Sequence, residues 1–497
     1  MRSNTGTRPH ALRSSAVLIG ILLLAYTVRV VGLQSESLWI DEGYSLALAG
    51  HGVHDIVRGT AADQHPPLYY LILRSWLLPG QSVFYSRYLS VLFGVLGVAV
   101  TVLLARVLLG GTEGSVAGLL LACSPIHVWY SQEVRMYALL TLFTTLSCFT
   151  TWRMTHREKG WFVHVIVSLL ALFTHYFAVF VLIAQSIYVL GRWLLCRDGA
   201  RLTRWVSAQA VVAMLFAPWV PTALYQARTH TMTWIHAPTA RDLHHTLRWM
   251  VLGDSGTWWS SAVLDGGLIL IALVLILGSL RTRRPTRYCF LWLLFGVPFV
   301  TITGISQVYP IFQPKQFLLL VPPMLILLSS VLTGQHRALG WILLGALIVV
   351  TLGSTISMGL SPSKDGWREA ARVIEKNYQE GDLLFLNPAA GKGTLDVYLS
   401  PMPAYAGYPP GYDIIAGGWQ GERVTADIAH ETLAPLALEH ERIWLVDFTA
   451  GFWDPEGHLV SWLQDHGQLE LDRSFRGVRV RAYSVGIRQE TNARNDH

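Results

Sequence analysis

The stretch RYLSVLFGVLGVAVTVLLARVLL, from Arg87 to Leu109, is a long apolar run that contains no acid and carries a basic residue only near each end. A helix needs about 20 consecutive apolar residues to cross the hydrocarbon core of a bilayer. The stretch therefore predicts a membrane-spanning helix. Because similar runs recur on both sides of it, membrane crossing decides the class of fold.

Apolar spans of comparable length are spread over the first 360 residues. They are predicted near 14–33, 87–109, 115–131, 137–153, 161–175, 176–195, 205–225, 259–280, 288–306, 317–333 and 338–358, which makes about eleven transmembrane helices. The segment 68–79 is also apolar, but it is short and bounded by proline, so we interpret it as an interfacial helix.

The composition agrees with a polytopic α-helical membrane protein. Of the 497 residues, 52% are hydrophobic and 14% are charged, whereas soluble proteins carry about a quarter charged residues. The net charge of +6 comes from cations in short loops between apolar segments, so it indicates membrane topology and does not favour nucleic acid as a partner. The four cysteines lie in or beside apolar spans and indicate no disulfide framework.

The basic residues also predict the orientation. Arg2, Arg8 and Arg13 precede the first span, which we interpret as an uncleaved helix that starts in the cytoplasm. Every second loop after it is basic, as the positive-inside rule requires: Arg106, 153–159, 192–204, 281–287 and Arg337. An odd number of helices then places the C-terminal region outside, and the expected location is the plasma (inner) membrane.

The composition changes to polar and mixed at 361–497. Segments 382–386, 443–448 and 478–485 have strand patterns, and 366–378 has a helical pattern, which together predict a small extracytoplasmic α/β domain. We therefore expect a transmembrane domain at 1–360 with a long outer loop at 34–86, followed by this α/β domain. The sequence Gly391-Lys-Gly-Thr lacks the full pattern of a phosphate-binding loop.

The outer loop contains two adjacent acids, Asp41 and Glu42, within SLWIDEGYS (37–45). In a helix, neighbouring side chains point about 100° apart, so the two carboxylates cannot both face one atom. One is expected to serve chemistry while the other is paired or structural. An interfacial helix with ordinary solvated acids explains the pair equally well.

Further polar residues are predicted at the outer ends of other segments. His65 precedes two prolines, Glu133 and Arg135 follow the third span, His175-Tyr176 joins two spans, and Lys315 begins the tenth. Taken singly, each has an ordinary explanation, such as a polar turn, a packing histidine or a snorkelling lysine. Taken together, they form a set of acids, cations and histidines on one membrane face.

That set fits an enzyme which acts on a lipid-phosphate substrate. A carboxylate can accept the proton of an acceptor hydroxyl, and cations can hold a phosphate that gains charge as it leaves. Asp41 and Glu133 could also supply oxygen ligands to a divalent cation, although no spacing requires a metal.

Five motifs carry a resemblance to a known family. WIDEGY (39–44), QHPPLYY (64–70), RYLSVLFG (87–94), SQEVRMYAL (131–139) and THYF (174–177) resemble, in family order, bacterial members of the dolichyl-phosphate-mannose protein mannosyltransferase family, which is of GT-C type. The resemblance covers about residues 15–335, and the C-terminal region carries no motif that matches.

The resemblance implies an inverting glycosyltransferase of the hexosyl- or pentosyltransferase class, which moves a sugar from a polyprenyl-phosphate donor to a hydroxyl of a lipid, glycan or protein on the extracytoplasmic face. It implies that Asp41 is the base. The other implied residues are Glu42 and Glu133, as further catalytic residues, and His65, Arg87, Arg135, Tyr137, His175, Tyr176 and Lys315, as substrate-binding residues. Lys315-Gln-Phe replaces the more usual Arg-Tyr, although lysine still supplies a point charge.

Two other classes stay open at this point. A transporter or flippase of a lipid-linked or small solute would place ionisable residues near the middle of the membrane, on broken helices in paired halves. A sensory membrane protein would instead use the C-terminal domain to bind a ligand. The sequence names neither the sugar nor the acceptor.

Overall fold

The structure is a computed structural model that describes residues 8–157, 159–229, 235–253, 258–334, 337–361, 364–417, 422–448 and 453–485. Arg2, which helped to predict the orientation, lies outside these residues. The chain forms two compact units. We call Met1–Leu33 with Asp63–Pro362 the helical unit, and Gln34–Ala62 with Ser363–His497 the α/β unit.

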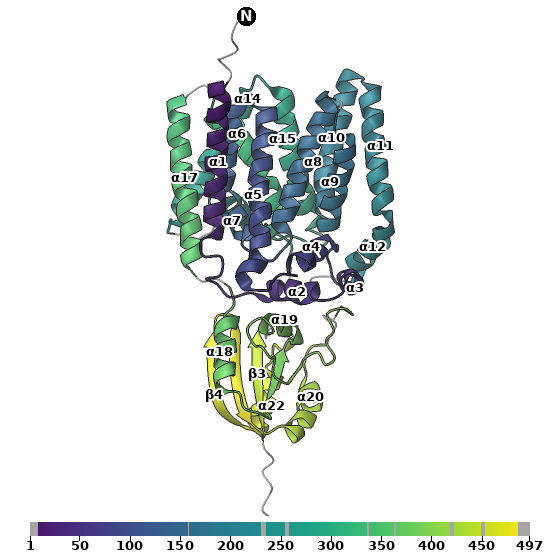
Figure 1. The fold of residues 1–497 in the computed structure, drawn as a ribbon, viewed down its shortest axis with the longest axis vertical. Coiled ribbons are helices and arrows are strands. Elements are labelled where there is room, and N and C mark those ends of the chain that lie inside the picture. Colours follow the sequence, from purple (N-terminus) through teal and green to yellow (C-terminus); the bar gives the residue numbers. More distant parts are fainter. Residues whose placement is uncertain are drawn as a thin grey trace, which may run out of the picture. The chain divides into compact units, whose positions relative to one another are not determined.

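The helical unit is a bundle of long helices (Figure 1). They are α1 (Arg8–Val30), α5 (Val83–Leu108), α6 (Gly111–Ala122), α8 (Tyr137–Arg157), α9 (Trp161–Thr174), α10 (Ala178–Cys196), α11 (Gly199–Phe216) with η1 (Ala217–Trp219) and α12 (Val220–Thr229), α14 (Ser261–Leu280), α15 (Pro285–Ile305), η2 (Pro314–Leu320) with α16 (Val321–Leu332), and α17 (Arg337–Leu360). Further helices among the described residues of this unit are α4 (Leu68–Trp76), α7 (Pro125–Ser131) and α13 (Ala240–Val251).

Within the described residues, seven helical segments are long and apolar enough to cross a membrane. They lie at the predicted spans 87–109, 176–195, 205–225, 259–280, 288–306, 317–333 and 338–358. The predicted first and fifth spans are shorter apolar helices, at Ser14–Val30 and Trp161–Thr174. The prediction of a polytopic helical membrane protein is confirmed.

The predicted single span 115–131 is divided between α6 and α7. Pro125 is the first residue of α7 and Ser124 before it is extended, with a φ of −66° and a ψ of 117°. A proline lacks the N–H that a continuing helix needs and drives the residue before it out of the helical conformation, so the break follows from Ser124-Pro125.

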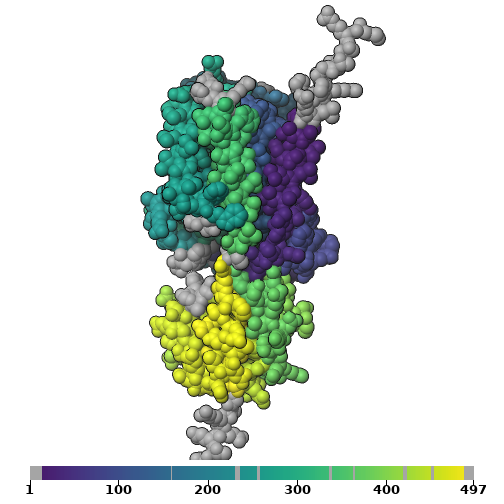
Figure 2. Space-filling model, turned by 90° about the vertical axis from the view of Figure 1, so that its left-hand side faces the viewer, coloured from purple at the N-terminus to yellow at the C-terminus, as the bar shows by residue number. Residues whose placement is uncertain are grey.

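The outside of the bundle is apolar, as a bilayer requires. Figure 2 shows α1 beside α17 on one face of the helical unit. Leu23 of α1 and Ile342 of α17 are 61% and 67% exposed. Inside the bundle, close helix contact uses small residues: a Cβ at Gly118 of α6 would lie 2.2 Å from Cγ2 of Val102 on α5. Small residues are the usual means by which membrane helices approach each other.

The α/β unit contains a five-stranded sheet among its described residues, in the order β2-β1-β3-β5-β4. The strands are β1 (Leu383–Asn387), β2 (Tyr405–Gly407), β3 (Arg442–Phe448), β4 (Gln468–Phe475) and β5 (Val478–Ser484). β1 is parallel to both β2 and β3, whereas β5 is antiparallel to β3 and β4. The predicted strands 382–386, 443–448 and 478–485 are confirmed as β1, β3 and β5.

Helices cover both faces of this sheet. α18 (Trp367–Asn377), the predicted 366–378 helix, packs on one face through Trp367 and Ile374. α20 (Ala426–Glu439) and α22 (His458–His466) pack on the other through Leu433 and Leu459. After β1 the chain forms η3 (Ala389–Gly391) and α19 (Lys392–Leu395) at the carboxyl edge of the parallel strands.

Two helices of the outer loop pack with the α/β unit. They are α2 (Ile40–Ala49) and α3 (Val53–Ala62), and α2 lies against η3 and α19. The boundary expected from composition, at 360/361, leaves these helices with the membrane spans. Packing groups them instead with a domain that begins more than 300 residues later in the chain.

Candidate active site

Five of the predicted site residues gather in the helical unit. We call them the cationic cluster: His65, Arg135, Tyr137, His175 and Lys315. His65 precedes α4, Arg135 lies in the turn between α7 and α8, and Tyr137 begins α8. His175 follows α9 and Lys315 lies in η2. Turns and helix ends therefore bring together side chains that are far apart in the sequence.

The ring of Tyr137 lies near Arg135, His175 and Lys315, and the ring of His65 lies beside that of His175. Nζ of Lys315 is 5.5 Å from its centroid and Cζ of Arg135 is 6.0 Å from it. The ring centroids of Tyr137 and His175 are 6.1 Å apart, and those of His175 and His65 are 5.2 Å apart. The negative face of an aromatic ring attracts cations, which explains how two positive side chains share so small a region.

Both histidines offer an N–H donor in this arrangement. Nη2 of Arg135 lies 3.1 Å from Nε2 of His65, and because a guanidinium can only donate, that nitrogen of His65 accepts. The backbone N–H of Phe177 donates to Nδ1 of His175 over 3.2 Å. Each neutral imidazole therefore carries its proton on the other ring nitrogen.

His65 is neutral because its surroundings oppose a further positive charge. Burial lowers the pKa of His65 well below its ordinary value of 6.5, and the positive charges of Arg135 and Lys315 lower it further. The cluster thus combines the basic side chains of Arg135 and Lys315 with imidazole N–H donors. Such a set suits a phosphate oxyanion, which accepts charge-assisted hydrogen bonds.

A buried arginine that the sequence analysis did not select supports the same region. Arg29, in the last turn of α1, is fully buried. Its guanidinium donates to the carbonyls of Leu121 and Ala122 at the end of α6, over 3.2 and 3.1 Å, and lies 2.7 Å from Nδ1 of His127 on α7. A cation at the C-terminus of a helix also interacts favourably with its dipole. An arginine in the last turn of an apolar helix was the available signal.

Arg29 also tethers the start of the turn that carries Arg135. Nε of Arg29 donates to Oγ of Ser131, the last residue of α7, over 3.2 Å. The side chain of Gln132 in turn donates to the backbone carbonyl of Arg29 over 3.0 Å. Glu133, which follows, is 2% exposed. Hydrogen bonds with Arg29 of α1 therefore hold the start of the α7–α8 turn.

Two further predicted residues have other surroundings. Nη1 of Arg87 donates to the backbone carbonyl of Leu33 over 2.9 Å, just after α1. The hydroxyl of Tyr176 donates to the side-chain oxygen of Gln226 and accepts from Nε1 of Trp219. These contacts tie Tyr176 to the α11–α12 segment, although the neighbouring His175 lies in the cationic cluster.

The two acids of the outer loop lie on α2 in the α/β unit. Oε2 of Glu42 accepts from Nζ of Lys364 over 3.1 Å and from the backbone N–H of Trp39 over 3.4 Å. The side chains of Glu42 and Lys364 are 0% and 7% exposed. Glu42 thus caps the start of its own helix and neutralises a buried lysine, which is a paired role of the kind expected for one of the two acids.

Asp41 has different electrostatic surroundings from its neighbour. It is partly exposed. Burial raises the pKa of Asp365, which precedes α18, and the charge of Asp41 raises it further, while a hydrogen bond with Trp367 lowers it. The nearby charge of Asp41 thus disfavours the ionised form of Asp365. Lys364 and Asp365, like Arg29, were not selected from the sequence.

In the described part of the chain, no three His, Cys, Asp or Glu side chains lie close enough together to hold a metal ion. Asp41 and Glu133, the two oxygen ligands suggested by the sequence, belong to different units. Their use with a divalent cation stays a prediction.

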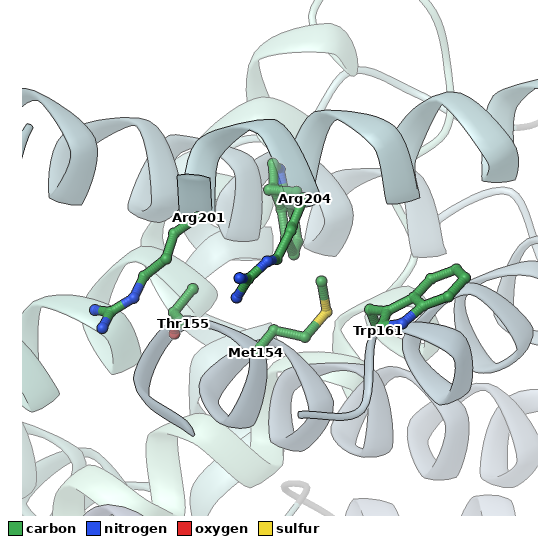
Figure 3. Close-up of a pocket in the computed structure, with 6 residues that line it drawn as sticks. Met154, Thr155, Trp161, Arg201 and Arg204 are labelled. Atoms are coloured by element: carbon green, nitrogen blue, oxygen red, sulfur yellow. The ribbon is translucent and has the colours of Figure 1, made fainter. Parts of the chain in front are cut away.

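A small pocket of the helical unit lies at the other end of α8 from Tyr137 (Figure 3). It is lined by Met154 and Thr155 of α8, Trp161 of α9, and Arg201, Arg204 and Trp205 of α11. α8 runs from Tyr137 to Arg157, and an α-helix rises about 1.5 Å per residue, so the pocket and the cationic cluster are separate features. Its arginines belong to the basic loops that were used to predict the orientation.

The fold is shared with solved membrane glycosyltransferases. ArnT from Cupriavidus metallidurans in the apo state has a TM-score of 0.64 at 13% identity, with 95% of this chain and 98% of that chain covered. The same protein bound to undecaprenyl phosphate has a TM-score of 0.61 at 14% identity, covering 93% and 97%. Archaeal oligosaccharyltransferase AglB from Archaeoglobus fulgidus, in complex with an inhibitory peptide and a dolichol-phosphate, has a TM-score of 0.56 at 11% identity, covering 97% and 75%.

These likenesses place the chain among membrane proteins of the GT-C fold. Residues 64–221 match the family described as dolichyl-phosphate-mannose-protein mannosyltransferase. The match confirms the resemblance that the motifs predicted, and it contains every residue of the cationic cluster except Lys315. No curated protein matches the sequence.

Proposed function

We propose that the protein transfers a sugar from a polyprenyl-phosphate donor to a hydroxyl of an envelope lipid, glycan or protein, on the extracytoplasmic side of the plasma membrane. The cationic cluster carries this proposal, because it gathers two basic side chains and imidazole N–H donors in one small region. The family match and the undecaprenyl phosphate bound by ArnT support the choice of donor.

In the proposed reaction the acceptor oxygen forms a bond to the anomeric carbon while the bond from that carbon to the phosphate oxygen breaks. The electron pair leaves with polyprenyl phosphate, whose growing negative charge Arg135, Lys315 and the imidazoles of the cluster stabilise. The carboxylate of Asp41 takes the proton of the acceptor hydroxyl. Attack opposite the leaving group inverts the anomeric centre.

The test uses the purified full-length protein in nanodiscs, with a panel of undecaprenyl-phosphate hexoses and pentoses as donors and an envelope extract as acceptor. Release of undecaprenyl phosphate and labelling of the acceptor are both measured. Replacement of a general base lowers the rate by about 10²- to 10⁴-fold, so Asp41→Asn should abolish transfer while leaving the binding of undecaprenyl phosphate unchanged.

Asp55→Asn is the matched control, because Asp55 is a partly exposed acid of α3 in the same loop segment. It should transfer at the wild-type rate. Transfer by Asp41→Asn at the wild-type rate would contradict the assignment of the base. Net movement of the lipid across the bilayer without bond cleavage would instead establish a flippase.

A further inference from the structure

The acid-bearing helix α2 is joined to the C-terminal part of the chain by a buried ion pair. Lys364 and Glu42 are 322 residues apart in the sequence, yet their side chains meet over 3.1 Å. Both are almost completely excluded from solvent. Because an uncompensated buried charge is strongly unfavourable, this pair fixes where α2 lies on the α/β unit.

The stretch Gly391-Lys-Gly-Thr, which lacks the full pattern of a phosphate-binding loop, makes the second connection. A Cβ at Gly393 of α19 would lie 2.9 Å from Cβ of Ala47 and 3.0 Å from the carbonyl oxygen of Gly43, both on α2. A Cβ at Gly43 would lie 2.0 Å from Oγ1 of Thr394. The two glycines thus let α2 and α19 approach at backbone distance, as small residues do in close helix pairs.

A third set of contacts holds the chain that leads into α2. The hydroxyl of Tyr398 accepts from the backbone N–H of Leu38 over 2.7 Å. The guanidinium of Arg368, on α18, donates to the backbone carbonyls of Gln34, Ser35 and Glu36 over 2.9 to 3.1 Å. The segment before α2 and α2 itself are therefore both held by residues of the C-terminal domain.

We propose that the α/β unit is a positioning frame for Asp41, and that Lys364 is a positioning residue of the transfer reaction, acting through Glu42. The inference rests on the proposed function. Neighbouring residues of a helix point about 100° apart, so anchoring Glu42 on Lys364 sets the rotation of α2 and hence the direction of Asp41. The C-terminal domain, in which the sequence showed no family motif, thereby gains a role in catalysis.

The experiment measures kcat and KM for the donor with full-length Lys364→Met, using the donor that the panel above identifies. A misplacement of about 1 Å can cost about a hundredfold in rate, so kcat should fall by about 10- to 100-fold. KM for the donor should stay within about twofold of the wild-type value, because the substitution does not alter the residues proposed to bind the donor. Lys364→Arg keeps the charge and should recover kcat to within about threefold of the wild type.

Lys376→Met is the matched control, since Lys376 is an exposed lysine of α18 in the same unit. It should leave both constants unchanged. The double variant Glu42→Gln with Lys364→Met should be no slower than Glu42→Gln alone. Either substitution already breaks the ion pair, so the two effects on kcat should not add. Hydrogen exchange of residues 40–49 in the same full-length variants reports whether α2 has loosened.

Wild-type kcat in Lys364→Met, with Asp41→Asn inactive, would overturn the positioning role and leave the proposed function standing. Equal changes in kcat for Lys364→Met and Lys364→Arg would also overturn it, since the charge would then be irrelevant. Wild-type transfer by Asp41→Asn would contradict the proposed function itself. The two failures are therefore distinguishable.

Discussion

The helical unit and the α/β unit concentrate opposite charges. The helical unit brings Arg135 and Lys315 to one tyrosine ring and keeps His65 neutral beside them. In the α/β unit, burial raises the pKa of the Asp365 carboxyl group and the charge of Asp41 raises it further, while Glu42 pairs with Lys364. The helical unit thus offers hydrogen-bond donors that suit an anion, whereas the α/β unit carries Asp41, the base that we propose.

The two units also fix their charges by different means. The turn that carries Arg135 is supported by Arg29, whose partners include backbone carbonyls of α6. Asp41 is carried on a helix that is held by a side-chain ion pair and a close glycine contact. Backbone carbonyls of a helix end cannot move independently, whereas an ion pair can be altered by one substitution. The cationic cluster should therefore be the more rigid of the two regions.

The largest expected effect comes from removing the support of the cationic cluster. Arg29→Leu leaves the carbonyls of Leu121 and Ala122 and the imidazole of His127 without their buried donor. Loss of one partner of such a network costs about 3 kcal/mol or more. Thermal unfolding in detergent should show this loss, together with weaker binding of undecaprenyl phosphate. Arg29→Lys, which keeps the charge but fewer donors, should lie between Arg29→Leu and the wild type. Unchanged stability in Arg29→Leu would mean that α7 is held by other contacts.

Much of this comparison could be predicted from the sequence. Hydrophobic spans, basic loops and strand patterns are local signals, so they predicted the helical class, the α/β domain and β1, β3 and β5. The outer ends of the spans also predicted which residues could meet in the cationic cluster, because antiparallel helices return their ends to the same face. Local patterns could not show that His175 and Tyr176, although adjacent, have different surroundings. His175 lies beside Tyr137, whereas the hydroxyl of Tyr176 bonds to Gln226 of α12.

The remainder depended on contacts between distant parts of the chain. Glu42 and Lys364 carry no pattern that links them across 322 residues, and the glycines of α2 and α19 have a meaning only once the helices touch. β4 and the short β2 were not predicted. The burial pattern of β4 is mostly exposed, so it shows little of the alternation that revealed β5.

The second prediction concerns a substitution within the cationic cluster itself. Arg135→Ala removes a guanidinium that is placed to bind a phosphate, and a hydrogen bond from a charged group contributes about 1.5 to 3 kcal/mol. The Kd for undecaprenyl phosphate, measured by tryptophan fluorescence in nanodiscs, should rise by about 10- to 100-fold. Arg241→Ala, an exposed arginine of α13 in the same unit, is the control and should bind normally. If both variants bind undecaprenyl phosphate with the same Kd, Arg135 does not contribute to phosphate binding.

The third prediction tests whether Tyr176 shares the role of its neighbour. Tyr176→Phe loses the hydrogen bonds with Gln226 and Trp219 and should cost about 1 kcal/mol of stability. Binding of undecaprenyl phosphate should not change. His175→Phe, by contrast, removes a donor from the cationic cluster and should weaken binding. A Tyr176→Phe variant that binds poorly but unfolds normally would support the substrate-binding role of Tyr176 that the family resemblance implies.

The smallest expected effect is on the pH dependence of stability. The pKa of His65 is lowered in the folded protein, so the unfolded chain takes up a proton first as the pH falls below the ordinary value of 6.5. The contribution of neutral His65 to the free energy of unfolding is therefore complete above pH 6.5 and is lost as the pH falls below it. The loss for one such group is up to about 0.8 kcal/mol near pH 6. His65→Gln should therefore lose less stability than the wild type between about pH 7.5 and pH 6. Bound undecaprenyl phosphate should reduce the difference, because an anion beside His65 raises its pKa again. If the difference persists unchanged with the lipid bound, the anion does not reach His65, and the cationic cluster is not where the phosphate lies.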